Sequence, residues 1–258
     1  DTNQIARKTI LIMSGYDGTS EEIFFGAGRA ALERGYNILL FDGPGQVGAR
    51  RFHPNMAFIP DYGEPITAVV DFALKRNDID PKRLALYGIS LGGYFAASGT
   101  IKEKRIQALI VNSPIVDIHE YLLAGGLSQL ENMPEDLRLE DFDYIPDETM
   151  NPKYKISLWN MCTRFGQTSA FALLEYLKKF NITGLLGELS IPTLAMVSEG
   201  EGKIPLKQAQ YYVDHVAGPA TLYIFDKQSG ADSHCQMNNS PLSNAVLYDW
   251  LDEIFNRQ

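Results

Sequence analysis

Gly88-Ile89-Ser90-Leu91-Gly92 is a G-x-S-x-G motif, and the segments on either side make it informative. Residues 83–87 are mostly apolar, as in a short strand, and residues 92–98 are mostly small and compatible with a helix. A serine at a sharp turn between a strand and a helix forms a nucleophile elbow, which exposes its hydroxyl at the positive end of the helix dipole. Side chains at Gly88 and Gly92 would clash across such a turn. The motif therefore predicts Ser90 as a nucleophile, and the competing interpretation is a structural serine in a turn.

Strand-like and helix-like segments alternate on both sides of this motif. The continuous apolar run at residues 9–13 is typical of a buried parallel strand, and further strands are predicted at residues 36–41, 106–111, 191–197 and 221–225. Helical spacing and capping signals predict helices over residues 19–35, 61–76, 205–216 and 244–255. This alternation is typical of an α/β fold with a mostly parallel, doubly wound sheet and right-handed crossovers.

Residues 118–187 interrupt the alternation, because no strand is clear there and the apolar spacing is helical. The segment lies between two strands whose carboxyl ends are at the ligand-binding edge of an open α/β sheet. We therefore expect a core formed by residues 1–117 and 188–258, with a helical lid inserted at 118–187.

Composition and charge exclude several classes of protein. The chain has 258 residues, of which 45% are hydrophobic and 21% are charged, and its net charge is −9. No apolar run approaches the roughly 18 residues of a membrane span, and the acidic balance argues against nucleic acid or an anionic membrane as partner. Cys162 and Cys235 have no metal-ligand spacing and form no disulfide framework, and no secretory signal opens the sequence. We expect a cytoplasmic enzyme without metal or cofactor.

A serine nucleophile needs a general base, and the base needs an acid that orients it. In this kind of fold the three residues follow the chain order serine, acid, histidine. Of the four histidines, His53, His119, His215 and His234, only His234 lies between the last predicted strand and the last predicted helix. We therefore expect His234 to be the base.

The acid should follow the strand predicted at residues 191–197. In this kind of fold the acid often lies nine residues after a proline of that strand and four residues before another proline. Glu201 has this spacing from Pro192 and Pro205. Glu199 and Asp117 are the alternative acids, and a further possibility is that both glutamates only solvate a loop.

Backbone N–H groups are expected to form the oxyanion hole. One is that of Leu91, directly after the nucleophile, and the other is that of Tyr16 in the loop after the first predicted strand. Asp17, Tyr94 and His119 are candidate substrate contacts. The Gly/Pro loop at residues 42–46 lacks the Lys-Ser/Thr of a phosphate-binding loop, so we expect it to be structural.

Together these residues resemble the α/β-hydrolase superfamily, and more closely its FrsA-like group. That group includes the fungal yellowish-green pigment hydrolases, 2,6-dihydropseudooxynicotine hydrolase, and bacterial proteins labelled dipeptidyl aminopeptidase/acylaminoacyl peptidase. The matching strings are residues 36–46, the elbow, and residues 229–236 with Asn238-Asn239 behind them. The resemblance implies a hydrolase with a helical cap, often a homodimer, with its nucleophile at Ser90 and its base at His234. Group members usually carry an N-terminal helical region and an aspartate as acid, and this sequence departs from both patterns.

The resemblance leaves the cleaved bond open, because one fold and one triad support several chemistries. We expect a serine hydrolase that cleaves an ester or amide in a small-molecule or acyl-peptide substrate. The alternative is a carbon–carbon bond hydrolase acting on a polyketide-like or β-diketone substrate. A second alternative is a non-catalytic binding module of the same fold.

Overall fold

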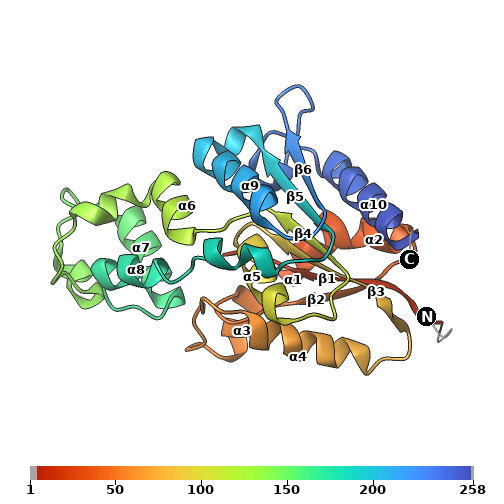
Figure 1. The fold of residues 1–258 in the computed structure, drawn as a ribbon. Helices are drawn as coiled ribbons and strands as arrows, with labels where there is room; N and C mark the ends of the chain where they lie inside the picture. Colours follow the sequence, from red (N-terminus) through yellow and green to blue (C-terminus); the bar gives the residue numbers. More distant parts are fainter. Residues whose placement is uncertain (1–4, 257–258) are drawn as a thin grey trace.

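The structure, a computed structural model, describes residues 5–256 and is built on a single six-stranded sheet (Figure 1). The strands are β1 (Arg7–Met13), β2 (Asn37–Phe41), β3 (Ile79–Ile89), β4 (Ala108–Asn112), β5 (Thr193–Ser198) and β6 (Ala220–Phe225). They are ordered β2-β1-β3-β4-β5-β6, and all five neighbouring pairs run parallel. The α/β fold with a mostly parallel sheet is thereby confirmed.

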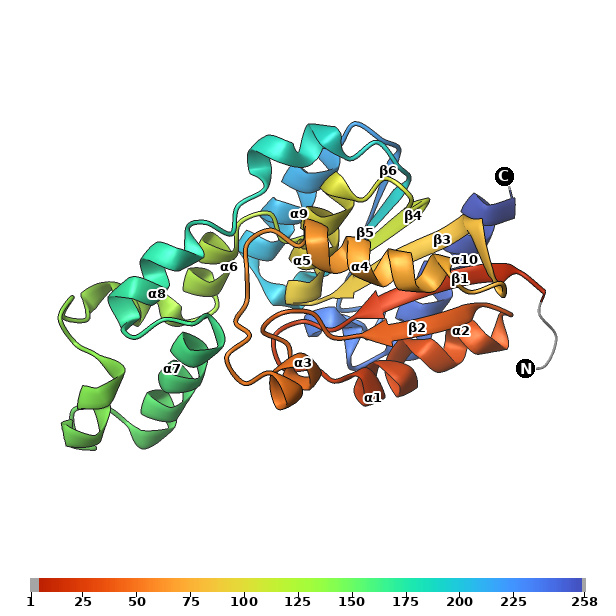
Figure 2. The same cartoon turned by 90° about the horizontal axis from the view of Figure 1, so that it is seen from below.

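Helices cover both faces of the sheet (Figure 2). One face carries α1 (Ser20–Ile23), the π-helix Phe24–Gly28, α2 (Arg29–Glu33) and α10 (Ser240–Asn256). The other face carries α4 (Gly63–Leu74), α5 (Leu91–Lys102) and α9 (Lys203–His215). Side chains along β1 alternate between the two layers, because Ile10 and Ile12 pack with the first set while Leu11 and Met13 pack with the second.

Two local features differ from the sequence-based prediction. The helix expected over residues 19–35 is present, but one π-helical turn, Phe24–Gly28, separates α1 from α2. A short helix, α3 (Val47–Phe52), follows the Gly/Pro loop where none was predicted. No helix within residues 5–256 is long and apolar enough to cross a membrane.

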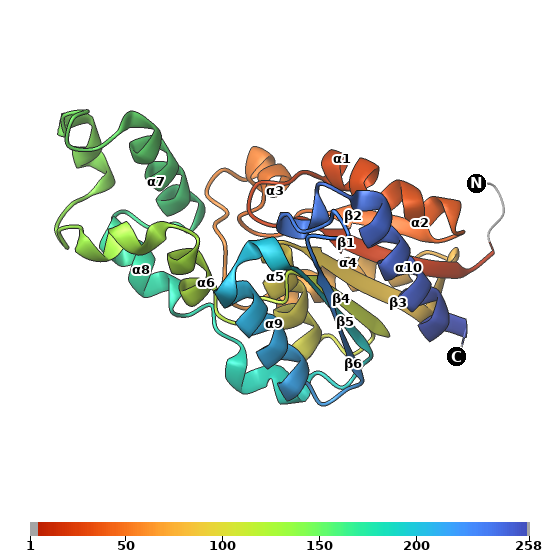
Figure 3. The same ribbon diagram turned by 90° about the horizontal axis from the view of Figure 1, so that it is seen from above.

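The segment between β4 and β5 is mainly helical. It contains α6 (Ile118–Ala124), α7 (Pro152–Arg164) and α8 (Ala170–Leu177), with short 3₁₀ turns between and after them. It projects from the carboxyl edge of the sheet (Figure 3). Its inner side chains, among them Phe165 and Phe180, join the same apolar cluster as Phe58 and Phe95 of the core. The segment is therefore packed onto the core through a shared hydrophobic layer.

Candidate active site

The G-x-S-x-G motif forms the sharp turn between β3 and α5. Ser90 has φ 58° and ψ −127°, a backbone conformation that non-glycine residues rarely adopt. A Cβ at Gly88 would lie 2.0 Å from the Gly92 carbonyl oxygen, and a Cβ at Gly92 would lie 2.4 Å from the Ser14 carbonyl oxygen. Both positions therefore require glycine. The second contact also shows that the loop after β1 lies against the elbow.

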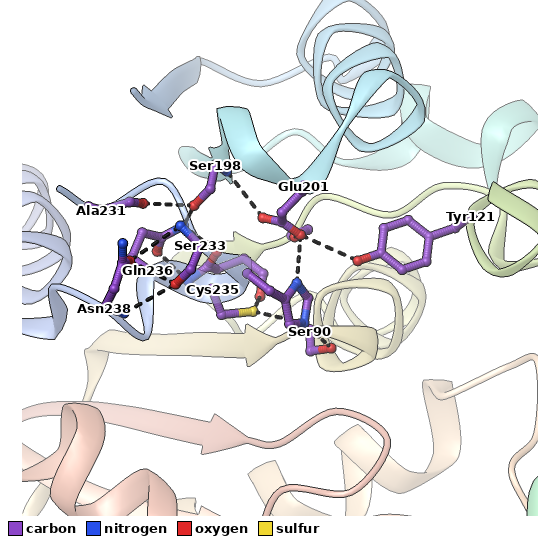
Figure 4. A network of polar contacts seen from close by, with 12 residues as sticks. Ser90, Tyr121, Ser198, Glu201, Ala231, Ser233, Cys235, Gln236 and Asn238 are labelled. Atoms are coloured by element: carbon purple, nitrogen blue, oxygen red, sulfur yellow. Dashed lines mark hydrogen bonds and ion pairs between the residues drawn. The ribbon is translucent and has the colours of Figure 1, made fainter. Parts of the chain in front are cut away.

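Ser90, His234 and Glu201 form a continuous chain of hydrogen bonds (Figure 4). Nε2 of His234 lies 2.9 Å from Oγ of Ser90, and Nδ1 lies 2.7 Å from Oε2 of Glu201. Ser90 follows β3, Glu201 follows β5 and His234 follows β6. Parallel strands bring such positions to one edge of the sheet. The His234 side chain is 45% exposed and the Glu201 side chain 2% exposed, so the imidazole faces the site and the carboxylate is buried behind it.

Glu201 is held by several donors besides His234. Its Oε2 accepts from Oγ of Ser113 at 2.6 Å and from the hydroxyl of Tyr121 at 3.3 Å, and its Oε1 accepts from the Ser198 N–H at 3.1 Å. Burial alone would raise the pKa of this carboxyl. The hydrogen bond and positive charge of His234, with the bonds from Ser113 and Ser198, outweigh burial and hold its pKa below the ordinary value. Glu201 is therefore an ionised carboxylate at neutral pH.

The two alternative acids lie elsewhere. Glu199 is exposed and accepts from the Lys227 N–H at 3.3 Å. Asp117 caps α6 by accepting from the Glu120 N–H at 2.9 Å, and its other oxygen accepts from the Asn181 amide at 2.8 Å. Neither carboxylate contacts His234.

The pKa of His234 is raised, and two neighbours are responsible. The Cys235 sulfur, 3.5 Å from Nε2, contributes most when it is a thiolate, and the Glu201 carboxylate beside Nδ1 contributes next. Burial raises the pKa of the Cys235 thiol, so the sulfur is neutral at neutral pH. The Glu201 carboxylate is therefore the group that stabilises the imidazolium under those conditions.

A hydrogen-bonded turn aims His234 at Ser90. Cys235 and Gln236 have positive φ values of 51° and 55°, which reverse the chain directly after the histidine. The buried Gln236 amide exchanges two hydrogen bonds with the Asn112 amide, of 2.8 and 3.2 Å, and donates to Oγ of Ser198 at 2.9 Å. The loop is thus fastened to the ends of β4 and β5.

The loop after β1 is positioned by Gln46, which is fully buried. The Gln46 amide nitrogen donates to the carbonyls of Ser14 and Gly15, and its oxygen accepts from the Gly43 N–H at 2.6 Å. The Tyr16 N–H in this loop meets no protein acceptor within residues 5–256. The Leu91 N–H is at the first position of α5, where N–H groups have no intrahelical partner. Tyr16 lines the same cavity as Ser90, and Leu91 directly follows Ser90 in the chain.

Arg164, at the end of α7, reaches from the inserted segment to the same loop. Its guanidinium donates to the Gly45 carbonyl at 2.8 Å and lies 4.1 Å from the centre of the Tyr16 ring. Burial lowers the pKa of Arg164 and raises the pKa of Tyr16 to about 12, so the cation faces a neutral phenol. The contact ties the inserted segment to the loop after β1.

A cavity of about 180 Å³ opens beside Ser90 and His234, between α1 with its π-helix and the start of α10. Asp17 lines it. Tyr94 is 1% exposed, donates its hydroxyl to the Pro60 carbonyl at 3.0 Å, and lies outside the cavity lining. His119, in α6, is also outside that lining. The described residues contain no cluster of three or more His, Cys, Asp or Glu side chains that could hold a metal ion.

Several supporting residues were not identified from the sequence. Ser113 had a positional signal, because it directly follows β4 at the same sheet edge as the other site residues. Tyr121 lies in the predicted lid with no signal of its own, and Gln46 and Gln236 lie within the matching strings at residues 36–46 and 229–236. Their hydrogen bonds join residues far apart in the chain, which no local spacing reveals.

The chain belongs to the Hydrolase_4 family, described as serine aminopeptidase, S33. The family model matches residues 4–140, more than half of the chain. Together with the sheet topology, this confirms the α/β-hydrolase group and supports hydrolase activity.

The chain is similar to curated fungal hydrolases. It is 26% identical over 260 residues to Hydrolase ORFZ of Pyricularia oryzae, covering 93% of this chain and 60% of that protein. It is 24% identical over 278 residues to Hydrolase LUC6 of a Fusarium species, covering 98% of this chain and 64% of that protein. The chain therefore spans less than two thirds of the length of these relatives.

Solved structures show the same fold. The structure of 2,6-dihydroxy-pseudo-oxynicotine hydrolase matches with a TM-score of 0.72 and 20% identity, covering 96% of this chain and 60% of that chain. Est1E from Butyrivibrio proteoclasticus, solved with ferulic acid bound, matches with a TM-score of 0.69 and 18% identity, covering 99% of this chain and 92% of that one.

Proposed function

We propose that the chain is a serine hydrolase that cleaves an ester or amide bond in a small-molecule or acyl-peptide substrate. The observation that carries the proposal is the hydrogen-bond chain from Ser90 through His234 to Glu201, with bonds of 2.9 and 2.7 Å. The distance between Ser90 and His234 allows proton transfer, and the hydrogen bond from His234 to Glu201 orients the base.

The reaction follows from these contacts. Nε2 of His234 takes the proton of the Ser90 hydroxyl while the oxygen attacks the substrate carbonyl carbon. The Tyr16 and Leu91 N–H groups stabilise the negative charge that develops on the carbonyl oxygen. The imidazolium then donates its proton to the leaving alcohol or amine, and the acyl group stays on Ser90. Water, deprotonated by His234, attacks the acyl-enzyme and restores the free hydroxyl.

Glu201 serves in this scheme as an ionised partner throughout. Its carboxylate accepts the Nδ1 proton of His234, which fixes the tautomer that leaves Nε2 free to accept from Ser90. A glutamate can replace an aspartate in this role, because only one carboxylate oxygen is needed at Nδ1.

Covalent labelling of the purified protein with a fluorophosphonate probe tests the proposal. The label should be on Ser90, and Ser90→Ala should remove both labelling and turnover of p-nitrophenyl esters. Labelling at another residue, or full activity of Ser90→Ala, would contradict the proposal. Acyl-peptide amides and β-diketones assayed in parallel identify the cleaved bond, and turnover of β-diketones alone would replace acyl transfer with carbon–carbon bond hydrolysis.

A further inference from the structure

The cavity beside Ser90 is formed by the core and not by the inserted segment. Its lining comes from the loop after β1, from α1 and the π-helix, from the end of β3, and from residues between His234 and Asn244. None of the described residues that line it belongs to 118–187. A substrate group entering this cavity is therefore selected by the helices on one face of the sheet.

The inner wall of the cavity is mostly apolar. Ile23, Ala27 and Tyr87 line it and are each no more than 5% exposed, so they form a closed wall. Met237 also lines the cavity and is 71% exposed, which places an apolar side chain at the rim. An apolar group that leaves water for this space gains free energy in proportion to the area it buries.

Apart from His234, whose imidazole pairs with the Glu201 carboxylate, the charged side chains of the lining are negative. Asp17 and Glu22 line the cavity and are exposed, and no lysine or arginine occurs among the described residues of its lining. A carboxylate on the entering group would lose hydration and meet charges of its own sign. The cavity thus favours an uncharged group.

We propose that this cavity receives an uncharged apolar group attached to the scissile bond, the size of a phenyl ring or a chain of about six carbons. A cavity of about 150 Å³ with apolar walls holds benzene, so a volume near 180 Å³ accommodates a group of this size. The assignment rests on the proposed function of Ser90. The group is either the acyl part or the leaving part of the substrate, since both are bonded to the carbon that Ser90 attacks.

Gly26 provides a direct test, because it lies in the π-helix and lines the cavity. A Cβ added at Gly26 would meet no heavy atom within 4 Å, so a side chain can be introduced there without a backbone clash. Gly26→Ala and Gly26→Leu should therefore fill the cavity in two steps. Gly187→Leu is the matched control, because a Cβ at Gly187 also meets nothing within 4 Å and Gly187 does not line the cavity.

The experiment compares kcat/KM in two series of esters. The acyl series consists of p-nitrophenyl acetate, hexanoate, benzoate and monoadipate, and the alcohol series consists of ethyl acetate and hexyl acetate. The wild type should prefer the longer chain about tenfold or more in the acyl or the alcohol series, since each additional methylene that leaves water adds to the favourable free energy of burial. If the acyl part enters, monoadipate should be hydrolysed about tenfold less efficiently than hexanoate. Gly26→Leu should abolish the preference, Gly26→Ala should weaken it, and Gly187→Leu should retain it. Gly187→Leu should keep the turnover of p-nitrophenyl acetate within about threefold of the wild-type value.

The outcomes distinguish a failure of the cavity assignment from a failure of the proposed function. If Ser90 is labelled and esters are hydrolysed but neither series shows a length preference, the cavity assignment is overturned. The same holds if Gly26→Leu reduces all substrates equally. If the wild type is neither labelled nor active on any ester, the proposed function fails, and the role of the cavity fails with it. A length preference in one series only supports the assignment and shows which substrate part enters.

Discussion

Glu201 is the residue whose replacement best tests the proposed triad. Glu201→Gln retains the side-chain shape but replaces the carboxylate that accepts from Nδ1 of His234 at 2.7 Å. The amide favours the wrong imidazole tautomer, so kcat should fall on the order of 10²–10⁴-fold in ester hydrolysis assays. Glu199→Gln is the control and should change kcat little, because Glu199 is exposed and its carboxylate accepts from the backbone N–H of Lys227 instead of from His234. A mild Glu201→Gln variant beside a crippled Glu199→Gln variant would disprove the assignment.

His234 should set the pH dependence of the reaction. The imidazole must be neutral to accept the Ser90 proton, so kcat/KM is low below the pKa of His234 and rises as pH passes through it. Because the environment raises this pKa, the midpoint should lie above the ordinary histidine value of about 6.5. A pH profile of kcat/KM with a fixed ester gives this midpoint. Glu201→Gln should lower it, and a wild-type midpoint at or below 6.5 would contradict the assignment.

At the scale of elements, α6 contacts the proposed triad through Tyr121. The Tyr121 hydroxyl donates to Oε2 of Glu201 at 3.3 Å, beside the shorter bond from Ser113. Tyr121→Phe removes this donor, which makes the carboxylate more basic and strengthens its hold on the imidazolium. The midpoint of the pH profile should therefore move upward by a few tenths of a unit, because a bond of this length is weak.

Tyr144→Phe is the matched control for this prediction. Tyr144 belongs to the same inserted segment and is 86% exposed, so its replacement should leave the pH profile unchanged. A downward shift in Tyr121→Phe, or an equal shift in both variants, would show that α6 does not act on Glu201.

The strands of this fold can be predicted from the sequence, whereas two of its short helical features cannot. The five apolar runs outside the elbow each correspond to an observed strand. Of these, β1, β4 and β5 are largely buried, as continuous apolar runs predict, whereas β2 is half-buried and β6 at the sheet edge is mostly exposed. Gln46 is the N-cap residue of the short helix α3, and its side chain makes no capping hydrogen bond. No local signal therefore marks the start of this helix. The π-helical turn at Phe24–Gly28 was not predicted either, because a local widening within a helix leaves the surrounding apolar spacing recognisable.

In the candidate site, too, only the residues marked by a local sequence signal could be predicted. Ser90 and His234 were predicted because a motif and the chain order place them. The bond from Ser113 to Glu201 joins residues 88 positions apart, and the Gln46 contacts with the loop after β1 cross 31 and 32 positions. Such contacts depend on how the strands are ordered in the sheet, which the spacing of residues along the chain does not specify.

At the scale of the whole molecule, the shared apolar cluster predicts that the inserted segment and the core unfold together. Phe165, at the end of α7, is 1% exposed, and its ring centre lies 4.9 Å from that of Phe58 and 5.3 Å from that of Phe180. Phe165→Ala should therefore cost about 3–5 kcal/mol of unfolding free energy. Phe171→Ala is the control, because Phe171 is 41% exposed and its loss should cost much less.

The two tryptophans report on the two parts of the molecule separately. Trp159 lies in α7 and Trp250 in α10, so Trp250→Phe leaves a reporter only in the inserted segment and Trp159→Phe leaves one only in the core. In urea titrations followed by fluorescence, both single-tryptophan proteins should unfold at the same midpoint. Phe165→Ala should lower both midpoints equally, because removing the ring weakens packing on both sides of the cluster. If the Trp159 signal changes at lower urea, and Phe165→Ala shifts that signal alone, the segment unfolds as a separate unit and its contacts through Phe165 and Arg164 do not couple it to the core.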